Sequence, residues 1–173
     1  NLISEEINFE ANSIDLIDKD NKIIAKKNVK IFNQKETIYA NEMDYDKINQ
    51  IIKAKGDIKI KNLEDNIEIF GDELTYFKAE EKIILNQNVE INFEKNFVFN
   101  TEKIIYDKLK KQININDFSN FKDRFGNKVS SKESKFLLDK KLLKIKSVKM
   151  IDELNNEYFF KNAIVNFKTS EII

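Results

Sequence analysis

The sequence contains no cysteine, histidine, proline or tryptophan, and only three glycines among its 173 residues. The missing cysteine rules out disulfides, thiolate nucleophiles and thiolate metal sites. The missing histidine removes the commonest general base and the commonest transition-metal ligand. So few glycines leave no loop to cradle phosphates, and no nucleotide-binding, serine-hydrolase or zinc-protease motif occurs. We therefore expect a protein that is not an enzyme and that has no cofactor and no metal site.

An excess of charge of one sign is also missing, because 30 basic and 30 acidic side chains cancel. A chain without net charge has no global field to attract a polyanion, so we expect no nucleic-acid partner. A basic face for binding a membrane surface is equally unsupported. No apolar run approaches the ~20 residues that a membrane-spanning helix needs. Because the chain begins at Asn1 rather than methionine, we expect a processed or excerpted segment, from which a signal peptide could have been removed.

The sequence does contain a repeat with a period of about 30 residues, which indicates about six copies of one two-strand unit. A small or polar residue anchors each unit, at spacings of 29, 31, 30, 30 and 31: Ala11, Ala40, Gly71, Thr101, Ser131 and Asn162. An apolar or aromatic residue follows five positions later: Leu16, Tyr45, Tyr76, Tyr106, Phe136 and Phe167. A second anchor lies 14 positions after the first in five units: Ala25, Ala54, Leu85, Ile115 and Ile145. One unit repeated throughout predicts a single domain over residues 1–173.

Both segments of each unit alternate between apolar and polar residues, which is typical of β-strands that bury one face. In residues 23–31, for example, the apolar side chains share one parity and their neighbours are mostly polar. The apolar parity changes near each anchor, as it does between Ala40 and Met43. Keeping one apolar face across such a change requires a bend or an extra residue, so we expect each unit to fold sharply near its anchor.

The pattern weakens after about residue 116, where Phe118 and Phe121 break the parity. Residues 124–128 predict a hairpin turn around Gly126, a residue suited to positive φ. Residues 130–145 also fit a helix, because three of their apolar residues share one helical face. The phase of the repeat favours strands there.

Polar and aromatic clusters admit chemical interpretations beside structural ones. Carboxylates such as Asp44 and Asp57 occupy outward or turn positions, where solvated charge explains them better than acid–base catalysis. Residues 18–21 faintly resemble a calcium loop but lack its glycine and its distal glutamate. Tyrosines recur at one position of the unit and could stack nucleic-acid bases. Zero net charge and the strict period favour a repeated core position instead.

A two-strand unit cannot bury its apolar face alone, so a sheet of such units must fold over on itself or pack on another element. The interior of a folded sheet is then either a packed core or a partly open groove for an apolar ligand. Periodicity by itself favours the packed core, because every β-sandwich alternates in this way.

The array of units resembles a known family. Its best copies are IYANEMDYD and IKAKGDIKI in residues 38–60, followed by IFGDELTY and LNQNVEI in residues 69–91. Over roughly residues 5–116, and more loosely beyond, this array is similar to the OstA-like periplasmic domain of lipopolysaccharide-transport proteins. The resemblance implies an all-β fold in which repeated two-strand units form one folded-over antiparallel sheet, called a β-taco or β-jelly roll. It also implies a non-enzymatic periplasmic conduit that shelters lipopolysaccharide acyl chains in an apolar groove.

The resemblance assigns the groove lining to the residues of inward parity. They are Phe9, Leu16, Val29, Ile31, Ile38, Tyr45, Ile58, Ile60, Ile69, Leu74, Tyr76, Leu85, Val89, Ile91, Phe99 and Tyr106. Strand-edge contacts with partners are expected at both ends of the sheet. They are Ile7, Phe9, Ala11, Tyr158, Phe160 and Phe167.

The partners implied are lipopolysaccharide, a neighbouring OstA-like bridge subunit added strand to strand, and the outer-membrane barrel or its plug lipoprotein. The location implied is the periplasm, with attachment to the outer membrane. Two members of the family fit, the N-terminal domain of the outer-membrane assembly protein and the soluble bridge protein. The number of units and an array that stops mid-pattern favour the first, whereas the missing cysteines put its disulfide link to the barrel in doubt. A closed β-solenoid or a β-sandwich binding module remains an alternative from outside the family.

Overall fold

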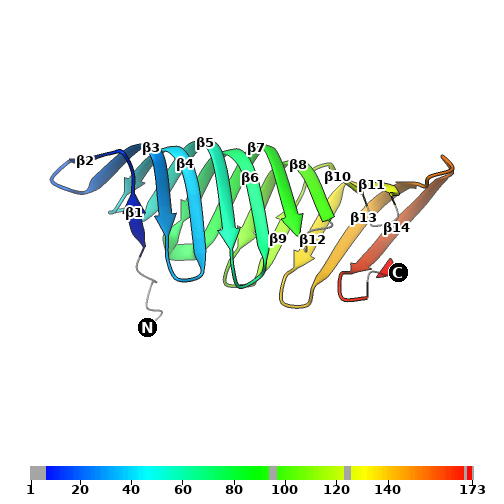
Figure 1. Ribbon diagram of the computed structural model, residues 1–173. Helices are drawn as coiled ribbons and strands as arrows, with labels where there is room; N and C mark the ends of the chain where they lie inside the picture. Colours follow the sequence, from blue (N-terminus) through cyan, green and yellow to red (C-terminus); the bar gives the residue numbers. More distant parts are fainter. Residues whose placement is uncertain (1–6, 94–96, 123–125, 170, 173) are drawn as a thin grey trace.

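The computed structural model describes residues 7–93, 97–122, 126–169 and 171–172, which form one sheet of fifteen strands (Figure 1). Neighbouring strands run antiparallel, as in the succession from β3 to β8. Within these residues the one helical segment is the 3-10 turn η1 (Lys78–Glu80). A helix long and apolar enough to span a membrane is absent from this described part. The predicted all-β fold is confirmed.

The strands fall into two groups. The first is β1 (Asn8–Glu10), β2 (Ser13–Ile17), β3 (Lys22–Phe32), β4 (Glu36–Asp46), β5 (Ile51–Asn62), β6 (Ile67–Phe77), β7 (Lys82–Phe93) and β8 (Phe97–Asp107). The second is β9 (Gln112–Ile115), β10 (Ser119–Lys122), β11 (Lys128–Ser131), β12 (Glu133–Leu137), β13 (Leu142–Ile151), β14 (Glu157–Asn166) and β15 (Glu171–Ile172). Pairs of short strands share a long partner: β1 and β2 pair with β3, β9 and β10 with β8, and β11 and β12 with β13. Each such pair is therefore one long strand interrupted near its centre.

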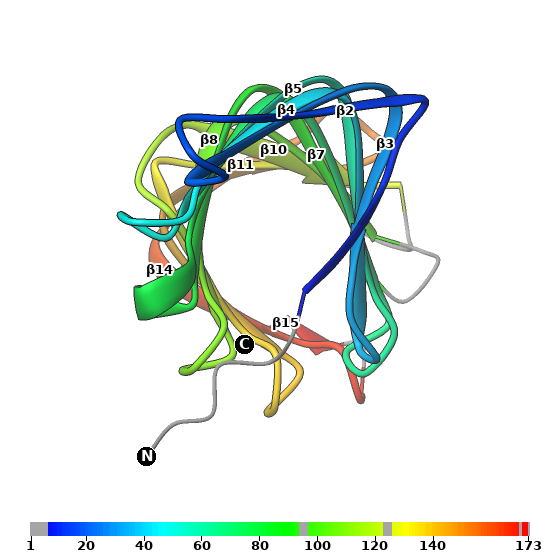
Figure 2. The ribbon, with the colours of Figure 1, turned by 90° about the vertical axis from the view of Figure 1, so that its left-hand side faces the viewer.

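The long strands bend near their centres, and seen end-on the sheet curves round a common axis (Figure 2). The register between β5 and β6 shifts at Gly56 and Asp57, which together oppose Asp72 alone. Both residues have positive φ, 75° and 48°. The same two-against-one arrangement recurs at residues 27–28 of β3 and 87–88 of β7. An extra residue bends and twists its strand, so these bulges fold the sheet where the anchors predicted a bend.

Short polar side chains join neighbouring corners of the folded sheet. Asparagine and aspartate tolerate positive φ better than other residues with a side chain, which suits them to these bulges. Their hydrogen bonds run from Asn28 Nδ2 to Asn12 Oδ1 (3.2 Å), from Asn41 Nδ2 to Asp57 Oδ2 (2.8 Å) and from Asn88 Nδ2 to Asp72 Oδ2 (2.6 Å).

In the C-terminal units a cluster of buried hydroxyls replaces these amide pairs. The Oγ atoms of Ser119, Ser131 and Ser134 lie 2.7 to 2.9 Å from one another, and the three residues are at most 4% exposed. Each hydroxyl both donates and accepts, so a triangle satisfies all three groups in a dry site. Thr101, an anchor of the repeat, lies beside them and donates to the carbonyl oxygen of Phe118 at 3.0 Å.

The structure decides the ambiguous stretch after residue 116. The parity break marks the interruption between β9 and β10, with Phe121 buried and Phe118 exposed. The helical alternative for residues 130–145 is wrong, since β11, β12 and the start of β13 lie there. Of the predicted turn at 124–128, Arg124 and Phe125 lie outside the described residues. Gly126 has the expected positive φ, at 84°.

The inner faces of the sheet form one apolar cluster that extends from β3 to β14. Its isoleucines are almost fully enclosed, with Ile52, Ile60, Ile69 and Ile83 all at 0% exposure. Phenylalanine rings continue the cluster towards the C-terminus, where Phe136 and Phe167 stack at a centroid distance of 5.9 Å. Two halves of each strand therefore pack against each other across one continuous interior.

Candidate functional site: an apolar interior and its polar seam

The structure places thirteen of the sixteen predicted lining residues in the core, at 2% exposure or less. They are Val29, Ile31, Ile38, Ile58, Ile60, Ile69, Leu74, Tyr76, Leu85, Val89, Ile91, Phe99 and Tyr106. Phe9 and Tyr45 are half-buried and pack against the core, with their rings 5.6 Å apart. Alternation along each strand thus identified the inner face nearly everywhere.

Leu16 is the exception: it lies on the inner side of the sheet, paired with Ile23, but it is not buried as a lining residue would be. Its side chain is 55% exposed, and Ile14 and Ile17 in the same strand are 45% and 41% exposed. Among the strands that the structure describes, β2 pairs with β3 alone, and it lies at the N-terminal end of the sheet (Figure 1). At that end the folded-over part of the sheet does not cover it, so the apolar parity of β2 has nothing to pack against.

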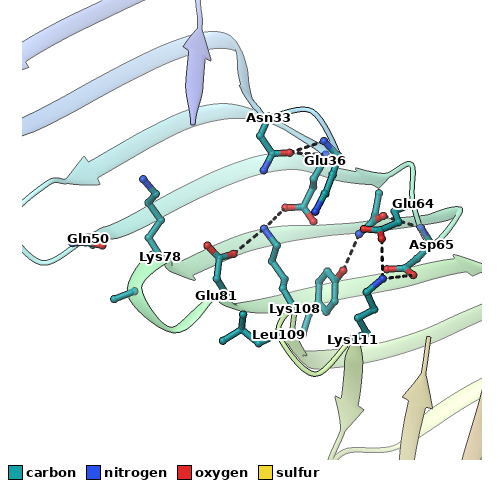
Figure 3. Close-up of a pocket in the computed structure, with 14 residues that line it drawn as sticks. Asn33, Glu36, Gln50, Glu64, Asp65, Lys78, Glu81, Lys108, Leu109 and Lys111 are labelled. Atoms are coloured by element: carbon teal, nitrogen blue, oxygen red, sulfur yellow. Dashed lines mark hydrogen bonds and ion pairs between the residues drawn. The ribbon is translucent and has the colours of Figure 1, made fainter. Parts of the chain in front are cut away.

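A polar seam lies along one side of the interior, where two rows of turns face each other (Figure 3). Residues 33–36 and 62–65 form one rim, and residues 78–81 and 106–111 form the other. Together with Gln50 these segments line a cavity of about 470 Å³. Within the second rim, backbone hydrogen bonds link successive turns, from Lys78 N to Gln50 O and from Lys108 N to Glu81 O, both at 3.0 Å.

Lys108 makes the innermost contacts across the seam. Its Nζ atom lies 3.0 Å from Glu36 Oε1 on the opposite rim and 3.1 Å from Glu81 Oε2 on its own rim. It also donates to the Tyr76 hydroxyl at 3.2 Å, while that hydroxyl donates to Glu81 at 2.6 Å. Burial disfavours the ammonium charge, but Glu36, Tyr76 and Glu81 outweigh burial and raise the pKa of Lys108. The lysine therefore stays charged although its side chain is only 17% exposed.

Two further polar contacts join the rims. Asn62 Nδ2 donates to the buried Tyr106 hydroxyl at 2.9 Å. Burial, followed by nearby carboxylates, raises the pKa of Tyr106, so its hydroxyl stays protonated at neutral pH. Lys111 reaches across to Glu64 at 3.0 Å and to Asp65 at 4.0 Å (Figure 3). The hydrogen bond with Lys111 lowers the pKa of Glu64, whereas burial raises the pKa of Asp65.

The sequence did not indicate this seam. Its charged residues sit in turns, where solvated charge is the usual explanation. Lys78, in the turn that follows β6, is half-buried and lines the cavity. No local pattern brings Glu36 near Lys108, because the two residues belong to different units of the repeat.

The two ends of the sheet present open strand edges, with one correction to the predicted contacts. In β14, Tyr158 and Phe160 are exposed, and within the described residues β15 pairs with residues 165 and 166 alone. At the other end Ile7, Phe9 and Ala11 are half-buried against the core. The prediction for Phe167 is wrong, because it is 6% exposed and packs 4.7 Å from the rings of Phe93 and Phe97. Its place in the repeat is an inner one.

These features suit the enclosure of apolar groups beneath a polar boundary. Among the described residues no group of three or more acidic, histidine or cysteine side chains is placed to hold a metal ion. The apolar interior offers dispersion contacts and exclusion of water. The seam offers paired charges of both signs at its edge.

Comparisons with known proteins agree with this architecture. The model of the family described as LptA/(LptD N-terminal domain) LPS transport protein matches residues 8–112. Among solved structures the chain is similar to LptH of Pseudomonas aeruginosa, described as the LptA homologous periplasmic component of the conserved lipopolysaccharide transport device. That similarity has a TM-score of 0.56 and 19% identity, and it covers 63% of this chain and 80% of LptH. At this identity the likeness shows the fold. Among curated proteins no match is found.

Proposed function

Since the chain belongs to the LptA/LptD N-terminal domain family of lipopolysaccharide-transport proteins, we propose that it is a non-enzymatic periplasmic conduit. It shelters the acyl chains of lipopolysaccharide inside the folded sheet and passes them towards the outer membrane. The observation that supports this most is the single apolar interior, which continues through successive units instead of closing off within each one.

The energetics favour transfer through such an interior. An acyl chain in water costs about 0.8 kcal/mol per exposed methylene, so a dozen carbons cost roughly 10 kcal/mol. An apolar interior removes most of that cost. Moving a chain from one apolar site to the next is then nearly neutral, so the direction of transport must come from an energy source outside this domain.

The interior residues are closely packed, since most of them are fully enclosed. Protein interiors have few voids larger than a water molecule. Lipid must therefore separate the two halves of the folded sheet as it enters. The strand pairing and the corner bulges need not break, because the separation occurs between side chains.

The open edges support a place in a chain of similar domains. A preceding bridge subunit would add a strand at Ile7, Phe9 and Ala11, and the next element would continue from Tyr158 and Phe160. We favour the N-terminal domain of the outer-membrane assembly protein, followed by the barrel or its plug lipoprotein and attached to the outer membrane. The soluble bridge protein of the same system is the second candidate.

Photocrosslinking in cells tests the proposal. A photoreactive phenylalanine would replace Phe99, which is fully buried on the inner face, or its neighbour Val98, which is 42% exposed on the outer face. Lipopolysaccharide adducts at position 99 and not at 98 are expected. Equal labelling would contradict the assignment of faces. No labelling at either position, in a folded and exported protein, would instead favour a closed β-solenoid or β-sandwich module.

A further inference from the structure

The seam has two properties that an apolar core alone does not need. Charges of both signs lie partly buried at its edge, and tyrosines cross from the core into it. Tyr76 and Tyr106 are each 2% exposed, while their hydroxyls bond to Glu81 and Asn62 of the seam. A tyrosine with its ring in an apolar region and its hydroxyl in a polar one marks a boundary between the two. Here the boundary separates the apolar interior from the charged rims.

An amphiphile held in this interior has to place its head group at such a boundary. Lys108 and Lys111 lie there, each bound to carboxylates of the opposite rim. Pulling the rims apart without a substitute anion would separate Lys108 from Glu36, whose side chain is only 6% exposed, and would leave Lys108 with Glu81 of its own rim. Separating a buried pair in this way is unfavourable. A phosphate that replaced the carboxylates would keep both lysines paired, through hydrogen bonds at least as strong.

We propose that the seam is the side entrance of the interior, and that Lys108 and Lys111 exchange their carboxylate partners for the phosphates of an anionic amphiphile as its acyl chains enter. The proposal rests on the proposed function, and it adds the place of entry and the chemistry of the head group. The bridges across the seam are made by side chains. They can part while the sheet, its corners and the backbone bonds along each rim remain intact.

The charge of the cavity limits what it binds. Lys35, Lys78, Lys108 and Lys111 are balanced by Glu36, Glu64, Asp65 and Glu81 in its lining. A balanced set attracts a small free anion only weakly, and Lys108 and Lys111 already have carboxylate partners. Inorganic phosphate should therefore not bind measurably, whereas phosphate attached to acyl chains gains the burial of those chains as well. This distinguishes an amphiphile site from a general anion site.

Locking the seam tests the entrance. The protein has no cysteine, so a pair introduced by Lys35→Cys and Leu109→Cys is unique. These positions lie on opposite rims, and a flexible crosslinker with a methanethiosulfonate group at each end would tie them together through two reducible disulfides. The matched control is the same cysteine pair treated with a reagent that modifies each thiol singly, which leaves the rims free to separate. The measurement is the rate of binding of bis-phosphorylated lipid A from detergent micelles.

We expect the locked seam to slow binding by at least about tenfold, because lysines held to their carboxylates cannot form a charged hydrogen bond with the entering phosphate. The rate should recover after the crosslinker is reduced. The singly modified control should bind at the rate of the untreated cysteine pair. Equal rates for the locked and the control protein would overturn the side entrance and leave the conduit standing. Absence of lipid binding in every form, unlocked protein included, would overturn the proposed function and this inference with it.

A charge-removing variant tests the head-group contact. Glu36→Gln with Lys108→Met removes both members of the innermost pair, so that Glu36 is not left as a buried charge, and Glu81 keeps its hydrogen bond from the Tyr76 hydroxyl. The unmodified protein should prefer bis-phosphorylated over dephosphorylated lipid A by at least about tenfold, and the double variant should lose that preference. An unchanged preference would refute the role of Lys108. Measurable binding of inorganic phosphate alone would show an anion site unrelated to lipid entry.

Discussion

Replacing Lys108 by methionine isolates the contribution of the seam to stability. Methionine keeps the length and the apolar stem of lysine, so packing against the Tyr76 ring is largely retained. The ammonium that Glu36 and Glu81 contact is lost, although Glu36 is only 6% exposed. A carboxylate that loses a buried ionic partner is destabilised more than an exposed one, because water does not replace the contact.

The magnitude follows from this burial. Breaking a fully buried pair costs about 3–5 kcal/mol. The side chains of Lys108 and Glu81 are 17% and 24% exposed, so we discount the cost to about 2–3 kcal/mol. The double variant Glu36→Gln, Lys108→Met removes both charges and should recover much of the loss. A coupling energy of more than about 1 kcal/mol between the two positions is expected.

Urea unfolding followed by far-ultraviolet circular dichroism measures these values. A loss of about 2–3 kcal/mol would also lower the Tm by roughly 4–12 °C in a domain of this size. The loss should not vary between about pH 6 and pH 9, because the raised pKa of Lys108 keeps its charge in the folded chain and lysine is also charged in the unfolded chain. A single variant within about 0.5 kcal/mol of the original protein would refute the reasoning.

Three other perturbations test separate parts of the fold. Phe99→Ala should destabilise the protein by about 3–5 kcal/mol through a core cavity, and the outward Val98→Ala by less than about 0.5, both in urea titrations. Gly56→Ala should cost about 1–3 kcal/mol, because φ is +75° there and the new Cβ would lie 2.8 Å from Asn41 Nδ2. An unchanged midpoint of urea unfolding in this variant would contradict the assignment of Gly56 to a bulge at the corner of the sheet. Burial raises the pKa of Tyr106 above 10.0, so its phenol should stay neutral past that pH and stability should fall as pH rises further. Titrating the tyrosine absorbance of the protein and of the Tyr106→Phe variant, and subtracting the two curves, isolates the phenol of Tyr106. A titration step near pH 10 in that difference would contradict the prediction.

The candidate interior was largely predictable from residues such as Ile60 and Phe99. A strand alternates its side chains between two faces whatever its neighbours are, so parity identifies the inner face locally. Leu16 shows where this reasoning stops. It has the correct parity, but its burial depends on a second layer that is missing at the end of the sheet. Phe167 shows the reverse case. It occupies an inner position of the repeat and is buried, although its place next to the last strand suggested a contact at the strand edge.

The sequence by itself determined the all-β fold, the period of the units, the inner face and the positions of the corners. Each of these depends on residues close together in the chain, through alternation, bulges and small anchor residues. The tertiary structure alone decided the seam. Glu36 meets Lys108, and Glu64 meets Lys111, because the folded sheet brings turns of different units together. Charged turn residues carry no local sign of such a meeting, since a solvated turn and a buried ion pair use the same side chains.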